Sequence, residues 1–145
     1  MRPEVDFVVV ANHAECLNGL LYLAGAGFTD LYQPPAPEGQ TAAVNIGVGV
    51  STIVPWSETN KEHSLTVAIE NEDGQVLWEA TDIKVEVGRS PGTVAGTDFR
   101  PQIAINAIMP CPPLGGYRVR ATFAKHTKSA AFRVAPPPGG NLRIA

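Results

Sequence analysis

The stretch A-A-V-N-I-G-V-G-V-S, residues 42–51, alternates between apolar side chains and small or polar ones. Val44, Ile46, Val48 and Val50 share one face of an extended chain, because successive side chains of a strand point to opposite faces. This period of two predicts a strand with one face in the core and one in water, as in antiparallel sheets. The expected wet face consists of Asn45, Gly47, Gly49 and Ser51.

The same period recurs along the chain, for example in S-L-T-V-A-I-E (64–70) and Y-R-V-R-A-T-F (117–123). No segment shows the three-to-four-residue apolar spacing of an amphipathic helix. We expect Val5 to Ala11, apolar on both faces, to form a central and fully covered strand. Eight or nine strands are expected in all, with one or two of these segments merging: 5–11, 15–17, 20–25, 42–51, 63–70, 75–80, 82–88, 101–108, 117–124 and 129–135.

Turn signals separate the predicted strands. Asn18-Gly19 and Glu72-Asp73-Gly74 are typical of hairpin turns, and the sequence holds 14 Gly and 13 Pro among 145 residues. Many short strands within one domain predict an all-β fold, a single antiparallel two-sheet sandwich of immunoglobulin-like type, with a jelly roll as the other arrangement. The expected domain covers residues 1–135, and residues 136–145 (P-P-P-G-G-N-L-R-I-A) are expected to form a flexible tail.

Targeting and cofactor signals are weak. The apolar run Phe7–Ala11 is too short for a signal peptide, and no run approaches the roughly 20 apolar residues of a membrane span, which predicts a cytoplasmic protein without a membrane partner. Cys16 and Cys111 are expected to be reduced thiols. We expect no cofactor and no metal, because no ligand spacing typical of zinc occurs and the acidic run 70–73 is better explained as a solvated turn than as a calcium site.

Charge is unevenly distributed. Residues 1–75 hold two basic and ten acidic residues, a net charge of −8, whereas residues 76–145 hold nine basic and four acidic residues, a net charge of +5. Arg118, Arg120 and Arg133 are predicted on the polar face of two neighbouring strands, where they form a candidate anion-binding site. The alternative is that they pair with acids of the first half, such as Glu70, or with Glu86. Nucleic acid is an unlikely partner, because the net charge is −3 and the nearby aromatic residues fall on inward faces.

Two polar loops, V-P-W-S-E-T-N-K-E (54–62) and G-R-S-P-G-T-V-A-G-T-D-F-R (88–100), are candidates for partner binding, because loops usually carry the binding function of a sandwich. Trp56 either closes the end of the sandwich or anchors a partner or a sugar. The candidate contact residues are Trp56, Glu58, Asn60, Arg89, Asp98 and Arg100.

Four stretches carry a resemblance: V-D-F-V-V-V-A-N-H-A-E-C-L-N-G-L-L-Y-L-A-G-A-G-F-T-D-L-Y, V-P-W-S-E-T-N-K-E-H-S-L-T-V-A-I-E-N-E-D-G-Q-V-L, E-V-G-R-S-P-G-T-V-A-G-T-D-F-R-P-Q-I-A-I-N-A-I and L-G-G-Y-R-V-R-A-T-F. In that order they resemble an uncharacterised bacterial family of small cytoplasmic β-sandwich proteins, over residues 4–135. The resemblance implies one intact domain and assigns no active residue.

The sequence shows no nucleophile, phosphate loop or paired-carboxylate pattern, so we expect no enzymatic activity. We expect a non-enzymatic cytoplasmic binding or assembly module that contacts a protein partner or itself through the end loops and a sheet edge. The charge split could let copies associate head to tail. Two alternatives stay open: anion or nucleic-acid binding through the basic hairpin, and sugar binding at Trp56.

Overall fold

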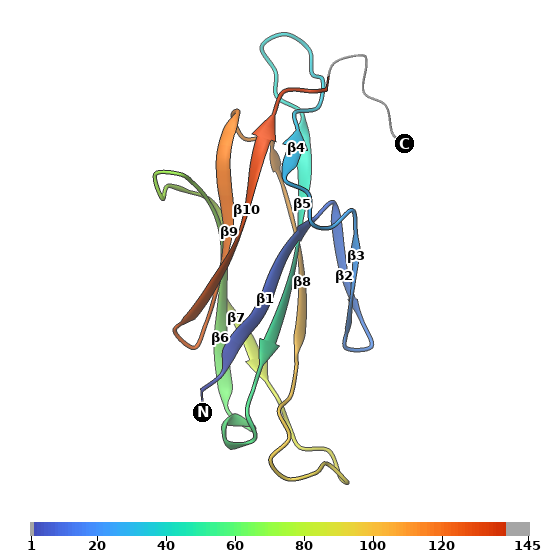
Figure 1. Cartoon of the computed structure of the whole chain (residues 1–145), viewed down its shortest axis with the longest axis vertical. Coiled ribbons are helices and arrows are strands. Elements are labelled where there is room, and N and C mark those ends of the chain that lie inside the picture. The colour runs from blue at the N-terminus through green and yellow to red at the C-terminus, as the bar shows by residue number, and fades with distance from the viewer. Residues whose placement is uncertain (1, 139–145) are drawn as a thin grey trace.

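The computed structural model describes residues 2–138, and these residues form an all-β fold (Figure 1). One turn of 3-10 helix, η1 (Trp56–Glu58), interrupts the strands. The described part of the predicted tail, residues 136–138, has no secondary structure, and the rest of that tail lies outside the described residues. The strands are β1 (Glu4–Ala11), β2 (His13–Leu17), β3 (Leu20–Ala24), β4 (Asp30–Tyr32), β5 (Ala43–Ile53), β6 (Glu62–Asn71), β7 (Val76–Glu86), β8 (Gln102–Pro110), β9 (Gly115–Phe123) and β10 (His126–Ala135).

Two larger sheets share one hydrophobic core. One has the order β1-β5-β8 and the other the order β4-β10-β9-β6-β7, with every pair antiparallel except β4 and β10. The alternating residues predicted to face inward are buried, including Val48 on β5, Val67 on β6 and Val119 on β9. The prediction of an all-β fold is confirmed.

A third, two-stranded sheet modifies the expected architecture. The β2–β3 hairpin stands apart from the edges of the larger sheets in Figure 1 and contacts β5 and β8. The immunoglobulin-like sandwich of two sheets is therefore not confirmed, because the described strands form three sheets.

The β2–β3 hairpin covers the face of β5 that was expected to be wet. Gly47, Gly49 and Ser51 are buried, and Asn45 is half-buried, so that expectation was wrong. The reason is steric: these residues are small, and a Cβ on Gly47 would lie only 2.9 Å from the His13 carbonyl carbon.

Strand β1 lies at a sheet edge, not at the predicted central position, since it pairs only with β5 among the strands of the described chain. Its core-facing Val10 is buried, whereas Phe7 on the other face is 39% exposed. The hairpin that follows β1 folds over the sheet and does not extend it, and β1 therefore remains an edge strand.

Several boundaries also differ. Segments 75–80 and 82–88 merge into the bulged strand β7, and β10 begins earlier than expected, after a turn at Ala124 and Lys125 with positive φ. The short strand β4 lies between the predicted strands 20–25 and 42–51, where no strand was expected. Within the described residues, the fold contains no helix that is long and apolar enough to cross a membrane.

Candidate functional site

The two predicted binding loops lie together at one end of the molecule, at the bottom of Figure 1, and they hold Trp56 between them. The guanidinium carbon of Arg89 lies 3.8 Å from the centre of the indole ring. Arg89 also donates from Nε to Thr59 Oγ1 at 2.7 Å and from Nη2 to the Trp56 carbonyl at 2.7 Å. Phe99 stacks on the indole at a centroid distance of 6.3 Å. The half-buried Trp56 is thus engaged by its own loops, as the closing role requires.

The remaining predicted contact residues make contacts other than those around the Trp56 indole. Glu58 forms an ion pair with Lys61 at 3.5 Å, and Asn60 has a positive φ of 58°. Asp98 is exposed in the second loop. Arg100 forms an ion pair with Asp6 on β1 and belongs to a different network.

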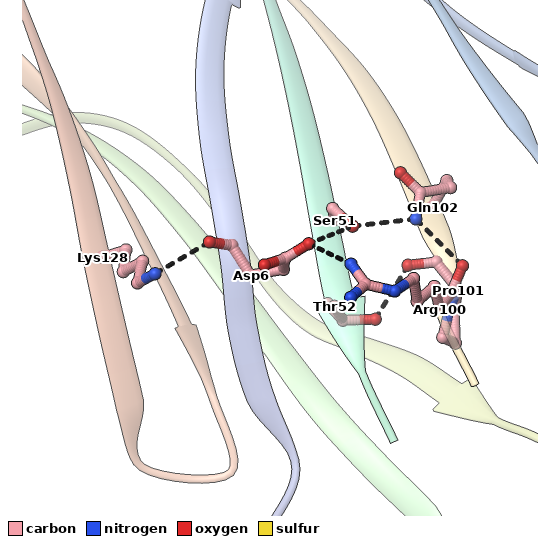
Figure 2. Close-up of polar contacts among 7 residues, drawn as sticks. All are labelled: Asp6, Ser51, Thr52, Arg100, Pro101, Gln102 and Lys128. Atoms are coloured by element: carbon pink, nitrogen blue, oxygen red, sulfur yellow. Dashed lines mark hydrogen bonds and ion pairs between the residues drawn. The ribbon is translucent and has the colours of Figure 1, made fainter. Parts of the chain in front are cut away.

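The hydrogen-bond network around Arg100 joins the three strands of one sheet through Asp6 on β1, Ser51 on β5 and Gln102 on β8 (Figure 2). Gln102 Nε2 donates to Ser51 Oγ at 2.8 Å and to the Arg100 carbonyl at 2.9 Å. Lys128 of β10 donates to the Asp6 carbonyl at 2.8 Å. These bonds hold the side chains of Arg100 and Gln102 in defined positions on the surface of the sheet.

A groove of about 460 Å³ opens directly beside this network, where the tip of the β2–β3 hairpin meets the sheet. Three large apolar side chains at the groove are substantially exposed: Phe7 by 39%, Leu20 by 59% and Tyr22 by 52%. We call this site the tip groove. Its lining residues are Phe7, Gly19, Leu20, Leu21, Tyr22, Arg100 and Gln102.

The sequence of the hairpin explains its position: it provides a tight turn at the tip and leucine side chains on the face that packs against β5. Asn18 and Gly19 have positive φ angles of 51° and 76°, which build the tight turn at the tip. Leu21 and Leu23 lie against Gly49, and their neighbours Leu20 and Tyr22 therefore point away from the sheet.

The side chain of Asn106 ties the hairpin to β8. Its Oδ1 accepts from the Ala14 backbone N–H at 3.1 Å, and its Nδ2 donates to the Ala14 carbonyl at 2.8 Å. Asn45 adds a bond from its Nδ2 to the Asn12 carbonyl at 2.8 Å. The hairpin is therefore held by polar contacts as well as by leucine packing.

Sequence reasoning missed the tip groove. The run L-L-Y-L (20–23) is apolar at every position, and the sequence therefore gives no sign that two of its members stay exposed. The one available signal was the Asn18-Gly19 turn, which predicts the hairpin but not the surface on which it lies.

The predicted anion-binding arginines each have a carboxylate partner. Glu70 is only 1% exposed and pairs with Arg118 Nε and with Arg120 Nη2, the latter at 3.4 Å. Arg133 lies 3.8 Å from Asp30. A cavity of about 420 Å³ is lined by Arg118 and Arg133 among others, so two of the three arginines border one hollow.

A family model matches residues 6–135. The chain belongs to the DUF6941 family, a family of unknown function. None of the curated proteins matches it. The match covers nearly the same residues as the resemblance seen in the sequence, and it confirms membership of an uncharacterised family.

Within residues 2–138 of this DUF6941 member, no three His, Cys, Asp or Glu side chains lie close enough together to bind a metal ion. Cys16 and Cys111 are both free thiols. Burial raises the pKa of the Cys111 thiol, and burial together with the nearby Cys111 raises the pKa of Tyr117. Tyr117 donates its hydroxyl to the Pro113 carbonyl at 2.6 Å, a bond that suits a structural residue of the core.

Proposed function

We propose that this chain is a non-enzymatic binding module that contacts a protein partner through the tip groove. One observation carries the proposal: Phe7, Leu20 and Tyr22 leave large apolar side chains exposed around a single hollow. Apolar surface that is concentrated in this way favours contact with another protein, whereas scattered exposed residues need no explanation.

The composition of the tip groove fits a contact of this kind. Tyrosine and arginine are enriched among residues that dominate binding energy, and both Tyr22 and Arg100 line the groove. Full burial of one aliphatic or aromatic side chain is worth about 1.5–3 kcal/mol. The partner that we propose inserts an apolar side chain between the hairpin tip and Phe7, with polar groups placed toward Arg100 and Gln102.

The groove is pre-organised by the contacts around it. Arg100, Gln102 and Ser51 are already joined by hydrogen bonds and an ion pair, so a partner does not have to order them on binding. In this proposal the end loop 88–100 contributes through Arg100, and Trp56 closes the end of the fold.

Anion binding remains the second candidate, and its support is the cavity that Arg118 and Arg133 share. An incoming anion would compete there with Glu70 and Asp30 for the same guanidinium groups. Binding of a polyanion such as heparin that weakens steeply with salt and with Arg133→Glu would favour it. Sugar binding at Trp56 has less support, because Arg89 already lies over the indole.

The experiment is a selection of phage-displayed random peptides on the whole chain. The test variant is Leu20→Ser/Tyr22→Ser, and the matched control is Leu114→Ser, since Leu114 is 54% exposed and lies outside the groove. We expect peptides rich in apolar residues that bind the wild type and the control and lose at least tenfold in affinity for the test variant. Peptides that bind all three proteins equally, or a selection that yields none, would contradict the proposal.

A further inference from the structure

We propose that the free edge of β8 pairs antiparallel with β8 of a second copy of this chain, which joins two three-stranded sheets into one of six strands. This inference does not rest on the tip groove as a partner site, although Gln102 belongs to both surfaces. It rests on backbone directions, on the side chains along each sheet edge and on the symmetry of the β8 sequence.

The backbone pattern shows which groups of β8 are unpaired by β5. The Pro101 carbonyl accepts from Thr52 N–H, and Cys111 N–H donates to the Ala42 carbonyl, so odd-numbered residues point their backbone groups toward β5. Because these directions alternate along a strand, even-numbered residues point theirs toward the other edge. The N–H and C=O groups directed there belong to Gln102, Ala104, Asn106 and Ile108.

The other edges of the two larger sheets, formed by β7, β4 and β1, are protected, as natural proteins usually arrange. Strand β7 is bulged and carries charged side chains along its length, among them Glu79 and Lys84. Strand β4 has only three residues. The edge of β1 faces β10, where Val5 N–H donates to His126 Nδ1 at 3.0 Å.

Strand β8 has neither the charged side chains nor the bulges of these edges, and the β2–β3 hairpin contacts it through the Asn106 side chain and the Gln102 carbonyl. Its sequence, Q-I-A-I-N-A-I-M-P, contains no charge, and its only proline is the last residue. Ile108 is 75% exposed although it lies inside a regular strand. A long, uncharged, apolar edge of this kind favours pairing with another strand.

The β8 sequence also favours a second copy of itself as that strand. In a two-fold register with Ile105 opposite Ile105, Gln102 pairs with Ile108 and Ala104 pairs with Asn106. This register uses all four free N–H groups, and no like charges meet across the axis. The Gln102 carbonyl, which accepts from the exposed Cys16 thiol at 3.3 Å, would exchange this weak bond for a backbone one.

The pairing would also account for the exposed Ile108. Residues directly opposite each other in an antiparallel pair point to the same face, so Ile108 of the partner subunit would lie beside Gln102. Each copy would cover the apolar side chain that the other leaves in water.

The first test is sedimentation of the full chain over a micromolar to millimolar series. Ile108→Pro removes an N–H that points away from β5, and edge strands tolerate such a proline. Ile108→Thr keeps that N–H and serves as the matched control. We expect a dimer for the wild type and for Ile108→Thr, and a folded monomer for Ile108→Pro; a monomeric wild type, or a dimer that persists in Ile108→Pro, would overturn the proposal.

The second test locates the axis and does not depend on the proline variant. In a Cys16→Ser background, Ile105→Cys should form a disulfide between copies under mild oxidation, while Ile103→Cys should not. The Cα atoms of two opposed residues at an axis lie within the range that a disulfide spans. Cross-linking at position 103 but not at 105, or at neither, would overturn the register.

Discussion

Gly47 and Gly49 leave the space in which the β2–β3 hairpin packs on β5, since a Cβ on either residue would meet a hairpin atom at 2.9 Å. A Cβ on Gly47 would lie 2.9 Å from the His13 carbonyl carbon and 3.0 Å from the Ala14 nitrogen, both of them backbone atoms that cannot rotate away. The alternation of residues 42–51 predicted the buried valine face correctly. It could not predict that the face with Gly47 and Gly49 would be buried, because small residues are equally compatible with exposure to water and with contact with a closely packed backbone.

Gly47→Ala is expected to lower the free energy of unfolding by about 1–3 kcal/mol, because overpacking would push β2 off the sheet. Chemical denaturation measures the change. Gly88→Ala is the control, since the nearest atom to its Cβ would be 3.8 Å away. Equal stability of Gly47→Ala and wild type would show that the hairpin does not lie on β5.

Cys111 gives a pH dependence at the same scale. Burial raises the pKa of its thiol above 9.0 in the folded state, so the unfolded chain releases this proton at lower pH. Stability should be fully present below pH 9 and should fall as the pH rises through 9 toward the folded pKa. In Cys111→Ser the decline should begin later, near 10, where Tyr117 takes over. Denaturation curves of the wild type and of Cys111→Ser from pH 8 to 11 test this, and an identical onset of the decline in both proteins would contradict it.

For the strands as elements, the alternation of apolar and polar residues predicted where strands occur but not which strands pair with one another. Residues 63–70 and 117–124 were predicted as strands and form β6 and β9, because one face of each meets the core. The edge position of β1 was not predictable, since its apolar faces do not specify which strands lie beside it. Strand β4 was missed because three residues carry no period, and its parallel pairing with Arg133–Ala135 depends on the tertiary fold.

The loop pair around Trp56 yields a prediction at this scale. Arg89→Ala removes the cation over the indole and two hydrogen bonds, so quenching of Trp56 fluorescence by acrylamide should increase at least twofold. The measurement uses a Trp78→Phe background, because Trp78 is the second tryptophan. Arg89→Lys should not restore protection, because an ammonium cannot reproduce the planar contact. Unchanged quenching in Arg89→Ala would contradict the closed arrangement of these loops.

At the scale of the whole molecule, the two oppositely charged halves of the sequence pair within one chain. Glu70 meets Arg118 and Arg120, and Glu62 meets Lys84 at 2.7 Å. The sequence predicted which side chains are charged and offered this pairing as one of two outcomes. It could not predict that the Arg100 side chain pairs with Asp6 while Arg89 contacts Trp56, because the segment 88–100 runs from one network to the other.

This pairing predicts how association of copies responds to salt. Because acidic and basic residues of the two halves pair within the chain and β8 is uncharged, the dimer dissociation constant should change less than about threefold between low and high salt. Sedimentation at the two ionic strengths measures it. A dimer that dissociates as salt is added would point instead to charge-driven, head-to-tail contact.

Nuclear magnetic resonance with isotope-labelled protein can show whether a peptide partner binds at the tip groove. Titration with a peptide selected on the whole chain should shift the backbone amides of Phe7, of the hairpin tip at 19–22 and of Arg100 and Gln102, while the amides of 117–123 stay unchanged. Shifts confined to the arginine-lined cavity or to the loop 54–62, with the hairpin tip unaffected, would rule out partner binding at the tip groove.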